Sequence, residues 1–411
     1  MPQDQSKKIE LLAPAGTPEK LEIAVHYGAD AVYLAGQDFS LRNLSGNFSS
    51  QELLAARRYT RDNNVRMYVT VNIYSRNSEA GAIADYLDFL KTVEPDALIV
   101  ADPAVFTQAR QRLPHIPLHI STQANTTNTG TARFWRELGA ARVNAARELT
   151  LEEIREIVRD SGIAVEAFVH GAMCMAVSGR CLMSGFMAGR ESNRGLCCQP
   201  CRFHYTVMEE TRPGQYFPIA EDLRGTYIFN SRDLCMIEHL PALIDAGICS
   251  LKIEGRMKSI HYLAGVVKVY REAIDSWYRN PDKYQVQPYW LSELSAISHR
   301  GYCTGFYFAD ADQTAANKDN LIVPGYRFVA KVTGELADGG VRVVVKNRIF
   351  TGEAVDVLSP GAVVRPDRIV RITDETGVSQ PLAQPGTTAT LYLDQQPKRL
   401  DLIRCPGEYP G

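Results

Sequence analysis

Residues 9–35 read IELLAPAGTPEKLEIAVHYGADAVYLA. In this stretch an apolar run, IELLA, is followed by an amphipathic segment from Thr17 to Tyr27 and then by a second apolar run, AVYLA. Thr17, placed before Pro18 and Glu19, is typical of a helix N-cap. A strand, a helix and a second strand in this order predict a β-α-β unit with parallel strands.

The same alternation continues to about residue 260 and gives eight candidate strands. They are IELLA from Ile9, AVYLA from Ala31, RMYVTVN from Arg66, ALIVA from Ala97, PLHIST from Pro117, ARVNAA from Ala141, VEAFVH from Val165 and SLKIEGR from Ser250. Helical stretches lie between them, such as Leu151 to Asp160 after the N-cap Thr150. This pattern predicts an α/β fold over residues 1–280, a (β/α)8 TIM-like barrel, with a doubly wound open sheet as the alternative.

Polar side chains stand at or just beyond the ends of most of these strands. In a parallel barrel the face formed by the carboxyl ends of the strands carries the active site. We therefore expect a functional site built from members of the set Asn72, Asp102, Gln123, Arg147, His170, Glu254 and Arg256.

A cysteine-rich segment, residues 166–205, follows the seventh strand as one long excursion. Within 28 residues it holds Cys174, Cys181, Cys197 and Cys201, surrounded by Gly, Ser, Arg and Asn rather than by a core-like apolar pattern. Because thiolates this close together are ligands for soft metals, the segment predicts an iron-sulfur or metal site at the barrel mouth.

Zinc, disulfides and inert thiols are the alternatives at this segment. Structural zinc usually takes short C-x(2–4)-C pairs, which Cys197 and Cys201 provide but the first two cysteines do not, so the spacing favours an iron-sulfur cluster. Cys198 is adjacent to Cys197 and leaves open which of the two is the ligand. The scattered cysteines are expected to be inert, buried thiols: Cys235, Cys249, Cys303 and Cys405.

The composition is that of an ordinary globular protein: 411 residues, 45% of them hydrophobic and 22% charged, with a formal net charge of −2. Any nucleic-acid partner must therefore be met by a local basic patch. No apolar run reaches the 18 residues of a membrane span, and the N-terminus MPQDQSKK lacks the apolar region of a signal peptide. We expect a cytoplasmic protein with reduced thiols and no membrane partner.

The pattern changes after about residue 325. The stretch GYRFVAKVTGELADGGVRVVVKNRIFTGEAVDVLSP alternates apolar and polar residues between Gly and Asp turns. It predicts a small C-terminal all-β barrel domain over residues 325–411. Residues 281–324 are expected to be a connecting segment.

Several motifs resemble the collagenase-like peptidase family U32, and the likeness covers essentially the whole chain. They are ELLAPAG at Glu10, GADAVYL at Gly28, H-G-A-x-C-x(4)-G-R-C-x-x-S from His170, G-x-C-x(3)-C-R at Gly195, NSRDL at Asn230 and LKIEGR-x-KS from Leu251. Despite its name, the family implies oxygen-independent hydroxylation of tRNA wobble uridine, ribosomal RNA or a quinone precursor. Its tRNA-modifying branch makes 5-hydroxyuridine.

The resemblance also implies a cofactor and a co-substrate. It suggests an iron-sulfur cluster, of the 4Fe-4S type, with its ligands at Cys174, Cys181, Cys197 and Cys201. It further suggests prephenate as the small-molecule hydroxyl donor. Four protein ligands would leave no open iron position, which favours a structural or electron-transfer cluster.

Site roles follow from the chemistry of such a reaction. Prephenate carries two carboxylates, and arginine and lysine answer carboxylates with charge-assisted hydrogen bonds. We expect substrate contacts from Asn72, Gln123, Arg147 and Arg256, and catalytic roles for His170, Lys252 and Glu254. Glu254 is either a general base or a salt-bridge partner of its cationic neighbours.

An RNA substrate needs cations for its phosphates and aromatic rings for a splayed base. Residues beside the cysteines provide both, and the predicted RNA contacts are Arg190, Arg194, Arg202 and Phe203, followed by His204 and Tyr205. The β domain adds Lys331, Arg342, Lys346 and Arg348 as a second candidate docking edge.

Three classes of function remain open from the sequence: an RNA hydroxylase, a peptidase and a non-catalytic iron-sulfur protein. Neither H-E-x-x-H nor G-x-S-x-G is present, so two common peptidase motifs are missing. A Cys–His nucleophile formed by Cys174 and His170 is the remaining peptidase arrangement.

Overall fold

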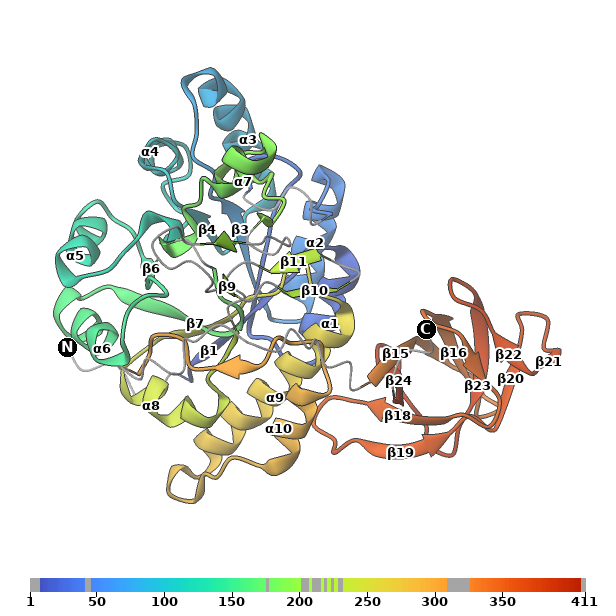
Figure 1. Cartoon of the computed structure of the whole chain (residues 1–411). Helices are drawn as coiled ribbons and strands as arrows, with labels where there is room; N and C mark the ends of the chain where they lie inside the picture. The colour runs from blue at the N-terminus through green and yellow to red at the C-terminus, as the bar shows by residue number, and fades with distance from the viewer. Residues whose placement is uncertain are drawn as a thin grey trace.

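The computed structural model describes residues 8–40, 46–174, 177–200, 207–208, 216–217, 220–222, 225–227, 232–308 and 326–407. It shows a barrel with helices around it and a separate sheet domain at its flank (Figure 1).

Eight parallel strands form the barrel, which confirms the predicted TIM-like fold. The order β1-β2-β3-β4-β5-β6-β7 is closed by β13, which pairs in parallel with both β7 and β1. The strands are β1 (Glu10–Pro14), β2 (Ala31–Leu34), β3 (Arg66–Val71), β4 (Ala97–Val100), β5 (Leu118–Ile120), β6 (Arg142–Asn144), β7 (Ala164–Ala172) and β13 (Ser250–Ile253).

The helices lie outside the strands and bury apolar side chains against them, and α9 is buried on all sides over its first eleven residues. They are α1 (Pro18–His26), α2 (Ser50–Asp62), α3 (Ala80–Val93), α4 (Pro103–Arg112), α5 (Thr129–Glu137), α6 (Leu151–Ser161), α8 (Leu240–Asp245) and α9 (Ile260–Arg279). The caps expected from sequence are present: Thr17 accepts the N–H of Lys20, and Thr150 forms a capping box with Glu153. None of the described helices combines the length and apolar character that a membrane span requires.

In the structure the excursion runs from the end of β7 at Ala172 to Asp233, which is longer than the predicted segment 166–205. It returns to the barrel through a strand that the sequence did not predict. β12 (Asp233–Cys235) pairs antiparallel with the last residues of β7, so that Cys235 lies opposite His170. β14 (Tyr302–Cys303) then adds in parallel to β12. Described parts of the excursion include η4 (Val177–Gly179), α7 (Met183–Ala188), η5 (Ser192–Arg194) and the pairs β8 (Val207–Met208) with β9 (Tyr216–Phe217) and β10 (Ala220–Asp222) with β11 (Gly225–Tyr227).

The C-terminal domain is all-β, as predicted, and is built on an eight-stranded antiparallel sheet. Its order is β19-β18-β24-β15-β16-β23-β20-β21, and a second pair joins β17 to β22. The end strands β19 and β21 do not pair with each other among the described residues. Its strands are β15 (Tyr326–Glu335), β16 (Val341–Val345), β17 (Ile349–Phe350), β18 (Ala354–Leu358), β19 (Arg365–Arg368), β20 (Arg371–Thr373), β21 (Ser379–Gln380), β22 (Leu382–Ala383), β23 (Thr388–Tyr392) and β24 (Leu402–Pro406).

The two domains share a core. Leu358, Leu400 and Leu402 of the sheet domain belong to the same buried apolar cluster as the outer side of the barrel. The contact lies along α1, α9 and α10 (Pro288–Ser295) (Figure 1). Tyr27 donates to the carbonyl of Leu358 at 2.6 Å, and Arg404 pairs with Glu293 of α10 at 2.7 Å.

Candidate functional site

Two predicted site residues, Asn72 and Gln123, meet at the carboxyl ends of β3 and β5. The Asn72 amide donates to Ser121 Oγ at 3.3 Å and to Gln123 Oε1 at 3.4 Å. Tyr74 adds a hydrogen bond from its hydroxyl to the carbonyl of Gln123 at 2.5 Å. Since Asn72 is buried and Gln123 is half-buried, this polar group forms part of the wall of the mouth.

A second group lies near the ends of β2 and β13 and includes Glu166 from the first half of β7. Lys252 Nζ is 2.7 Å from Glu166 Oε1 and 4.7 Å from the centre of the Tyr33 ring. The Tyr33 hydroxyl donates to the Ile253 carbonyl at 2.9 Å and lies 3.5 Å from Glu254 Oε2. Lys252 and Glu254, both predicted to be catalytic, therefore both contact Tyr33.

Arg147 completes this second group from the end of β6. Its guanidinium stands 4.1 Å from the centre of the Phe168 ring, and the Lys252 ammonium lies 5.6 Å from the same ring. Such cation–π contacts orient a guanidinium while leaving its edge donors available. Arg147 is half-buried, which suits a side chain that meets a ligand at the mouth.

Arg256, also predicted to bind substrate, is held beneath the loop that follows β2. Its side chain is buried and donates to Ser40 Oγ at 2.9 Å and to Asn47 Oδ1. These contacts use the guanidinium to fix the loop against β13. A direct substrate contact by Arg256 therefore stays a prediction.

His170 lies in different surroundings from the other predicted residues. It is buried among the rings of Tyr262 and Tyr270 of α9 and Tyr302 of β14, with centroid distances of 5.3–5.9 Å. Burial lowers the pKa of His170 to about 3, more than the neighbouring Asp233 carboxylate raises it, so the imidazole is neutral at pH 7. Neither ring nitrogen has a hydrogen-bond partner among the described residues. Among the described residues, no group is placed to exchange a proton with His170, so its catalytic role stays a prediction.

The excursion is fastened across the mouth by contacts to three barrel loops. Arg194 forms a two-pronged ion pair with Glu79 and donates to the Tyr74 carbonyl at 3.1 Å. Arg180 donates to the Tyr74 hydroxyl and the Gln123 carbonyl at 2.8 and 2.9 Å. On the β6 side, the Ser178 hydroxyl donates to Glu148 at 2.7 Å. The excursion therefore covers the ends of β3, β5 and β6.

The described cysteines of the excursion carry free thiols, and Cys201 lies outside the described residues. Cys174 is exposed, and Cys181 and Cys197 are partly exposed. The N–H of Met183 donates to Cys181 Sγ over 3.4 Å. Cys198 lies 3.1 Å from the buried Ser184 Oγ, which engages its thiol.

The donor set fits an iron-sulfur cluster in its chemistry. Soft sulfur ligands stand in a polar segment, and the described part of the excursion contains no disulfide. The described side chains alone do not converge on a complete metal site, since no three His, Cys, Asp or Glu residues among them meet. Cys235, one of the cysteines expected to be inert, lies close to the start of the excursion, because β12 sets it opposite His170.

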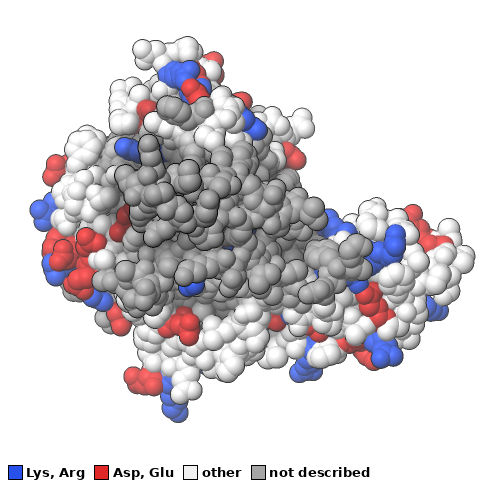
Figure 2. All heavy atoms as spheres, viewed as in Figure 1, with Lys and Arg blue, Asp and Glu red and all other residues white. Residues whose placement is uncertain are grey.

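The predicted RNA contacts divide into two groups. Arg190 is exposed, whereas Arg194 is engaged by Glu79 and Glu191 and serves as an anchor of the excursion. Arg202 and Phe203 lie outside the described residues. In the view of Figure 2, the described cationic and anionic side chains are mixed around the outline of the molecule.

In the β domain, two of the four residues predicted to dock RNA contact the barrel instead. Lys331 and Lys346 both pair with Glu19 of α1, at 2.6 and 3.2 Å, and so join the two domains. Arg342 and Arg348 are exposed and remain candidate phosphate contacts.

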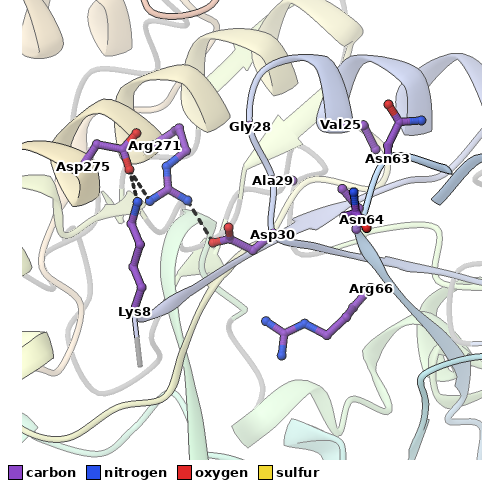
Figure 3. A pocket seen from close by; sticks show the side chains of 11 residues that line it. Lys8, Val25, Gly28, Ala29, Asp30, Asn63, Asn64, Arg66, Arg271 and Asp275 are labelled. Atoms are coloured by element: carbon purple, nitrogen blue, oxygen red, sulfur yellow. Dashed lines mark hydrogen bonds and ion pairs between the residues drawn. The ribbon is translucent and has the colours of Figure 1, made fainter. Parts of the chain in front are cut away.

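A pocket of about 530 Å³ opens at the opposite end of the barrel. Its lining includes Gly28, Asp30, Asn64 and Arg66, which lie at the amino ends of β2 and β3, and Arg271 of α9 (Figure 3). Arg271 pairs with Asp30 at 2.9 Å, so much of the lining charge is compensated. Because enzymes of this fold act at the other face, we assign this pocket no role in the reaction.

Several side chains of the mouth and interior were not found from sequence. Tyr33, Phe168, Arg142 and Glu166 lie within predicted strands, where the apolar pattern drew attention away from them. A signal was available: Arg142, Glu166 and Glu10 are charged residues inside otherwise apolar strands, and buried charges must be paired.

Comparison with known proteins assigns the chain to a family. Residues 16–317 match peptidase family U32 and residues 324–404 match the peptidase family U32 C-terminal domain. The chain therefore belongs to peptidase family U32, as its motifs suggested.

Individual relatives carry two kinds of name. The chain is 43% identical to tRNA hydroxylation protein P1 of Bacillus subtilis, over 74% of this chain and 71% of that protein. It is 34% identical to tRNA hydroxylation protein P of Escherichia coli, over 94% and 93%. It is also 32% identical to a collagenase of Porphyromonas gingivalis, over 72% and 73%.

Proposed function

We propose that this protein is an iron-sulfur-dependent, oxygen-independent tRNA hydroxylase that forms 5-hydroxyuridine at the wobble position. The observation that carries the proposal is the alignment with a protein named for tRNA hydroxylation over 94% of this chain. The cysteine excursion fastened over the barrel mouth supports it, because it brings candidate cluster ligands to the face where such barrels act. The proposal places the protein with tRNA in the cytoplasm.

The mouth offers groups suited to a small anionic donor, for which we propose prephenate. Lys252 and Arg147 present positive charge beside the Tyr33 and Phe168 rings. A carboxylate bound there would gain charge-assisted hydrogen bonds in a site of low water content. Asn72 and Gln123, on another part of the wall, would orient hydroxyl or carbonyl groups of the same molecule.

Glu254 is the proposed proton-handling group. It is half-buried at the end of β13, and its carboxylate lies near the Tyr33 hydroxyl. Hydroxylation at uracil C5 must remove the proton that C5 carries, and a carboxylate within reach of the base can accept it. Glu254→Gln would keep the shape of the side chain and remove this capacity.

The cluster is assigned to thiolates of Cys174, Cys181, Cys197 and Cys201. When bound, such a cluster supplies electron transfer or holds the excursion in shape. The chain's own part is to place the thiols close together in sequence, on a segment that Arg180 and Arg194 anchor above the mouth.

The decisive experiment is nucleoside mass spectrometry of total tRNA from a strain lacking this protein. Re-expression of the wild type should restore 5-hydroxyuridine and its derivatives, and Cys181→Ala should not. The matched control is Cys405→Ala, which removes a buried thiol in the C-terminal sheet and should restore the nucleoside. Unchanged tRNA in the deletion strain would rule the proposal out and direct attention to ribosomal RNA and quinones.

Ligand identity is tested separately by iron content. Purified Cys174→Ala, Cys181→Ala and Cys197→Ala should lose iron and sulfide, whereas Cys198→Ala should retain them. Cys201→Ala is expected to lose them too, and Cys235→Ala is included because β12 places this thiol opposite His170. Retention in Cys201→Ala with loss in Cys235→Ala would move the fourth ligand to β12.

A peptidase remains the second candidate, because one relative is named a collagenase. It would require Cys174 to be activated by His170, yet His170 is buried and neutral while Cys174 is exposed. No hydrogen bond joins the two among the described contacts. Cleavage of denatured collagen by the iron-free protein, abolished in Cys174→Ala, would establish this alternative.

A further inference from the structure

Three cations and two carboxylates form one continuous line through the inside of the barrel. Arg66 pairs with Glu10 at 2.6 Å, and Glu10 pairs with Arg142 at 2.6 Å. Arg142 reaches Glu166 at 3.1 Å, and Glu166 pairs with Lys252 at 2.7 Å. The line begins at a half-exposed arginine on the amino end of β3 and ends at a buried lysine near the mouth.

Strand register explains why these side chains meet. Ser250 is paired with Glu10 on β1 and with Glu166 on β7, so one layer of the interior contains all three. The Ser250 hydroxyl donates to Glu10 at 2.7 Å, which shows that its side chain points inward. Lys252 lies two residues further along β13, on the same face and one layer nearer the mouth.

The line is not neutral. Arg66, Arg142 and Lys252 carry three positive charges, and Glu10 and Glu166 carry two negative ones, which leaves one positive charge in excess. Burial alone would raise the pKa of Glu166, but Lys252 and Arg142 outweigh it and hold the pKa below its usual value. Glu166 is therefore ionised and is shared between the two cations.

Other groups around Lys252 do not cancel the excess. Burial, with a smaller contribution from Arg142, lowers the pKa of His119 well below its usual value, so this imidazole is neutral. Tyr33 and Phe168 present rings to the ammonium. Glu254 contacts Tyr33, and the carboxylate that the structure pairs with Lys252 is that of Glu166.

A buried charge without a counter-charge is costly, and the cost falls when an anion binds beside it. Arg66 has 43% of its side chain exposed and can be solvated by water, whereas Lys252 has only 6% exposed. An ammonium has three N–H donors, and Glu166 accepts from one of them. The uncompensated part of the charge therefore lies at the mouth.

We propose that Glu166 is a positioning residue that orients Lys252, and that this line of charges directs its one excess positive charge at a carboxylate of the bound donor. The inference rests on the proposed function, since it needs an anionic small molecule in the mouth. It adds Glu166, with Arg142 behind it, to the residues on which donor binding depends.

A double-mutant cycle separates positioning from a purely structural ion pair. The four proteins are the wild type, Glu166→Gln, Lys252→Met and the double variant, and the probe is prephenate in isothermal titration calorimetry. Lys252→Met should weaken binding about tenfold or more. Glu166→Gln should weaken it about tenfold when Lys252 is present and less than about twofold in the Lys252→Met background, because its effect passes through the ammonium.

The choice of variants guards against loss of the fold. In Lys252→Met the Glu166 carboxylate keeps Arg142 as its partner, and in the double variant Arg142 keeps its ion pair with Glu10. Circular dichroism and thermal melting should show all four proteins folded at the titration temperature.

The outcomes are distinct. Equal weakening by Glu166→Gln in both backgrounds, or no weakening at all, overturns the positioning role. The same four genes are also tested by tRNA nucleoside analysis in the deletion strain. If the wild type hydroxylates tRNA without binding prephenate, the donor assignment fails and the cycle is judged on 5-hydroxyuridine yield. If the wild type leaves tRNA unchanged, the proposed function fails, and this inference falls with it.

Discussion

Glu10 shows how one buried carboxylate can hold several strands. It accepts hydrogen bonds from Arg142 of β6, Ser250 of β13 and Tyr68 of β3, and it also pairs with Arg66. Burial raises the pKa of Glu10, but the two arginines outweigh it and the net shift is downward. The carboxylate is therefore charged at neutral pH and is part of the barrel's interior.

Glu10→Gln should destabilise the protein by about 3–5 kcal/mol at pH 7, because it leaves Arg142 buried with one partner fewer. Urea unfolding measures this change. Since the folded pKa lies below the ordinary 4.5, the stabilisation is complete above that pH and is lost as pH falls through the lower folded value. The difference between wild type and variant should therefore shrink below about pH 4.5.

The control for this substitution is Glu94→Gln. Glu94 pairs with Arg61 at 2.7 Å on the exposed surface, where solvent screens the attraction. This variant should unfold at the wild-type urea concentration. An equal loss in both variants would show that the interior network has no special role.

Of the individual residues of the site, only some could be predicted from the sequence. Asn72 and Gln123 could be predicted because they follow strands, and the structure brings them together. Glu10, Arg142 and Glu166 were missed because their partners come from strands distant in sequence. His170 was predicted from its place at a strand end, but the tyrosines that bury it come from α9 and β14.

Among the elements, the described residues 177–200 of the excursion are held to the barrel by a few polar anchors. Arg194 makes two of these contacts, to Glu79 and the Tyr74 carbonyl, and also pairs with Glu191 within the excursion. Arg190, four residues earlier, is exposed. The two arginines form a matched pair for testing anchoring.

Arg194→Ala should loosen the excursion from the loop after β3, because a two-pronged ion pair and a backbone contact are lost together. Hydrogen exchange of residues 177–200 should become faster, and iron should be lost sooner during dialysis against a chelator. Arg190→Ala should leave both rates unchanged. Equal rates in Arg194→Ala and wild type would contradict the anchoring role.

Helix α9 carries another buried histidine, His261, which stacks on Phe328 of the C-terminal sheet at 5.8 Å. Burial lowers its pKa to about 3, assisted by Arg404. The unfolded chain takes up a proton below about pH 6.5 and the folded protein does not, so the protein loses stability as pH falls. The contribution approaches about 1.4 kcal/mol per pH unit between about pH 5.5 and pH 4.

His261→Phe should therefore flatten the dependence of unfolding free energy on pH by about that slope. Urea titrations from about pH 7.5 down to about pH 4.5 measure it. The slopes of the two proteins should agree above about pH 7, which serves as the internal control. Parallel curves at every pH would show that folding does not change the pKa of His261.

Periodicity was a good guide to the elements. All eight barrel strands were found because each is a short apolar run between amphipathic helices. β12 was missed, since its three residues pair antiparallel with β7 and have no periodic signal of their own. In the C-terminal domain the sequence predicted strands but not their order in the sheet, because alternation reveals strands and not which of them pair.

The whole molecule behaves as two folds with one joint core. Leu358, Leu400 and Leu402 are buried in the apolar cluster that also covers the barrel helices. Glu19 binds Lys331 and Lys346 across the same junction. Such a contact ties the stability of the sheet domain to that of the barrel.

Leu402→Ala should lower the stability of both domains together, by about 2–5 kcal/mol, because it opens a cavity in their shared core. Calorimetry should show one unfolding transition that moves to lower temperature. The comparison is Leu391→Ala, a buried leucine in the sheet domain's separate core. Two resolved transitions in the wild type would contradict the joint core.

The position of the excursion within the chain also sets an order of events during synthesis. The barrel closes only when β13 pairs with β1, and β13 ends at Ile253, which is 52 residues after Cys201. At typical rates of translation these residues take about 3–10 s to make. The proposed cluster ligands thus leave the ribosome while the last gap in the barrel wall is still open. Assembly factors would have those seconds to reach the thiols from the side that β13 later seals.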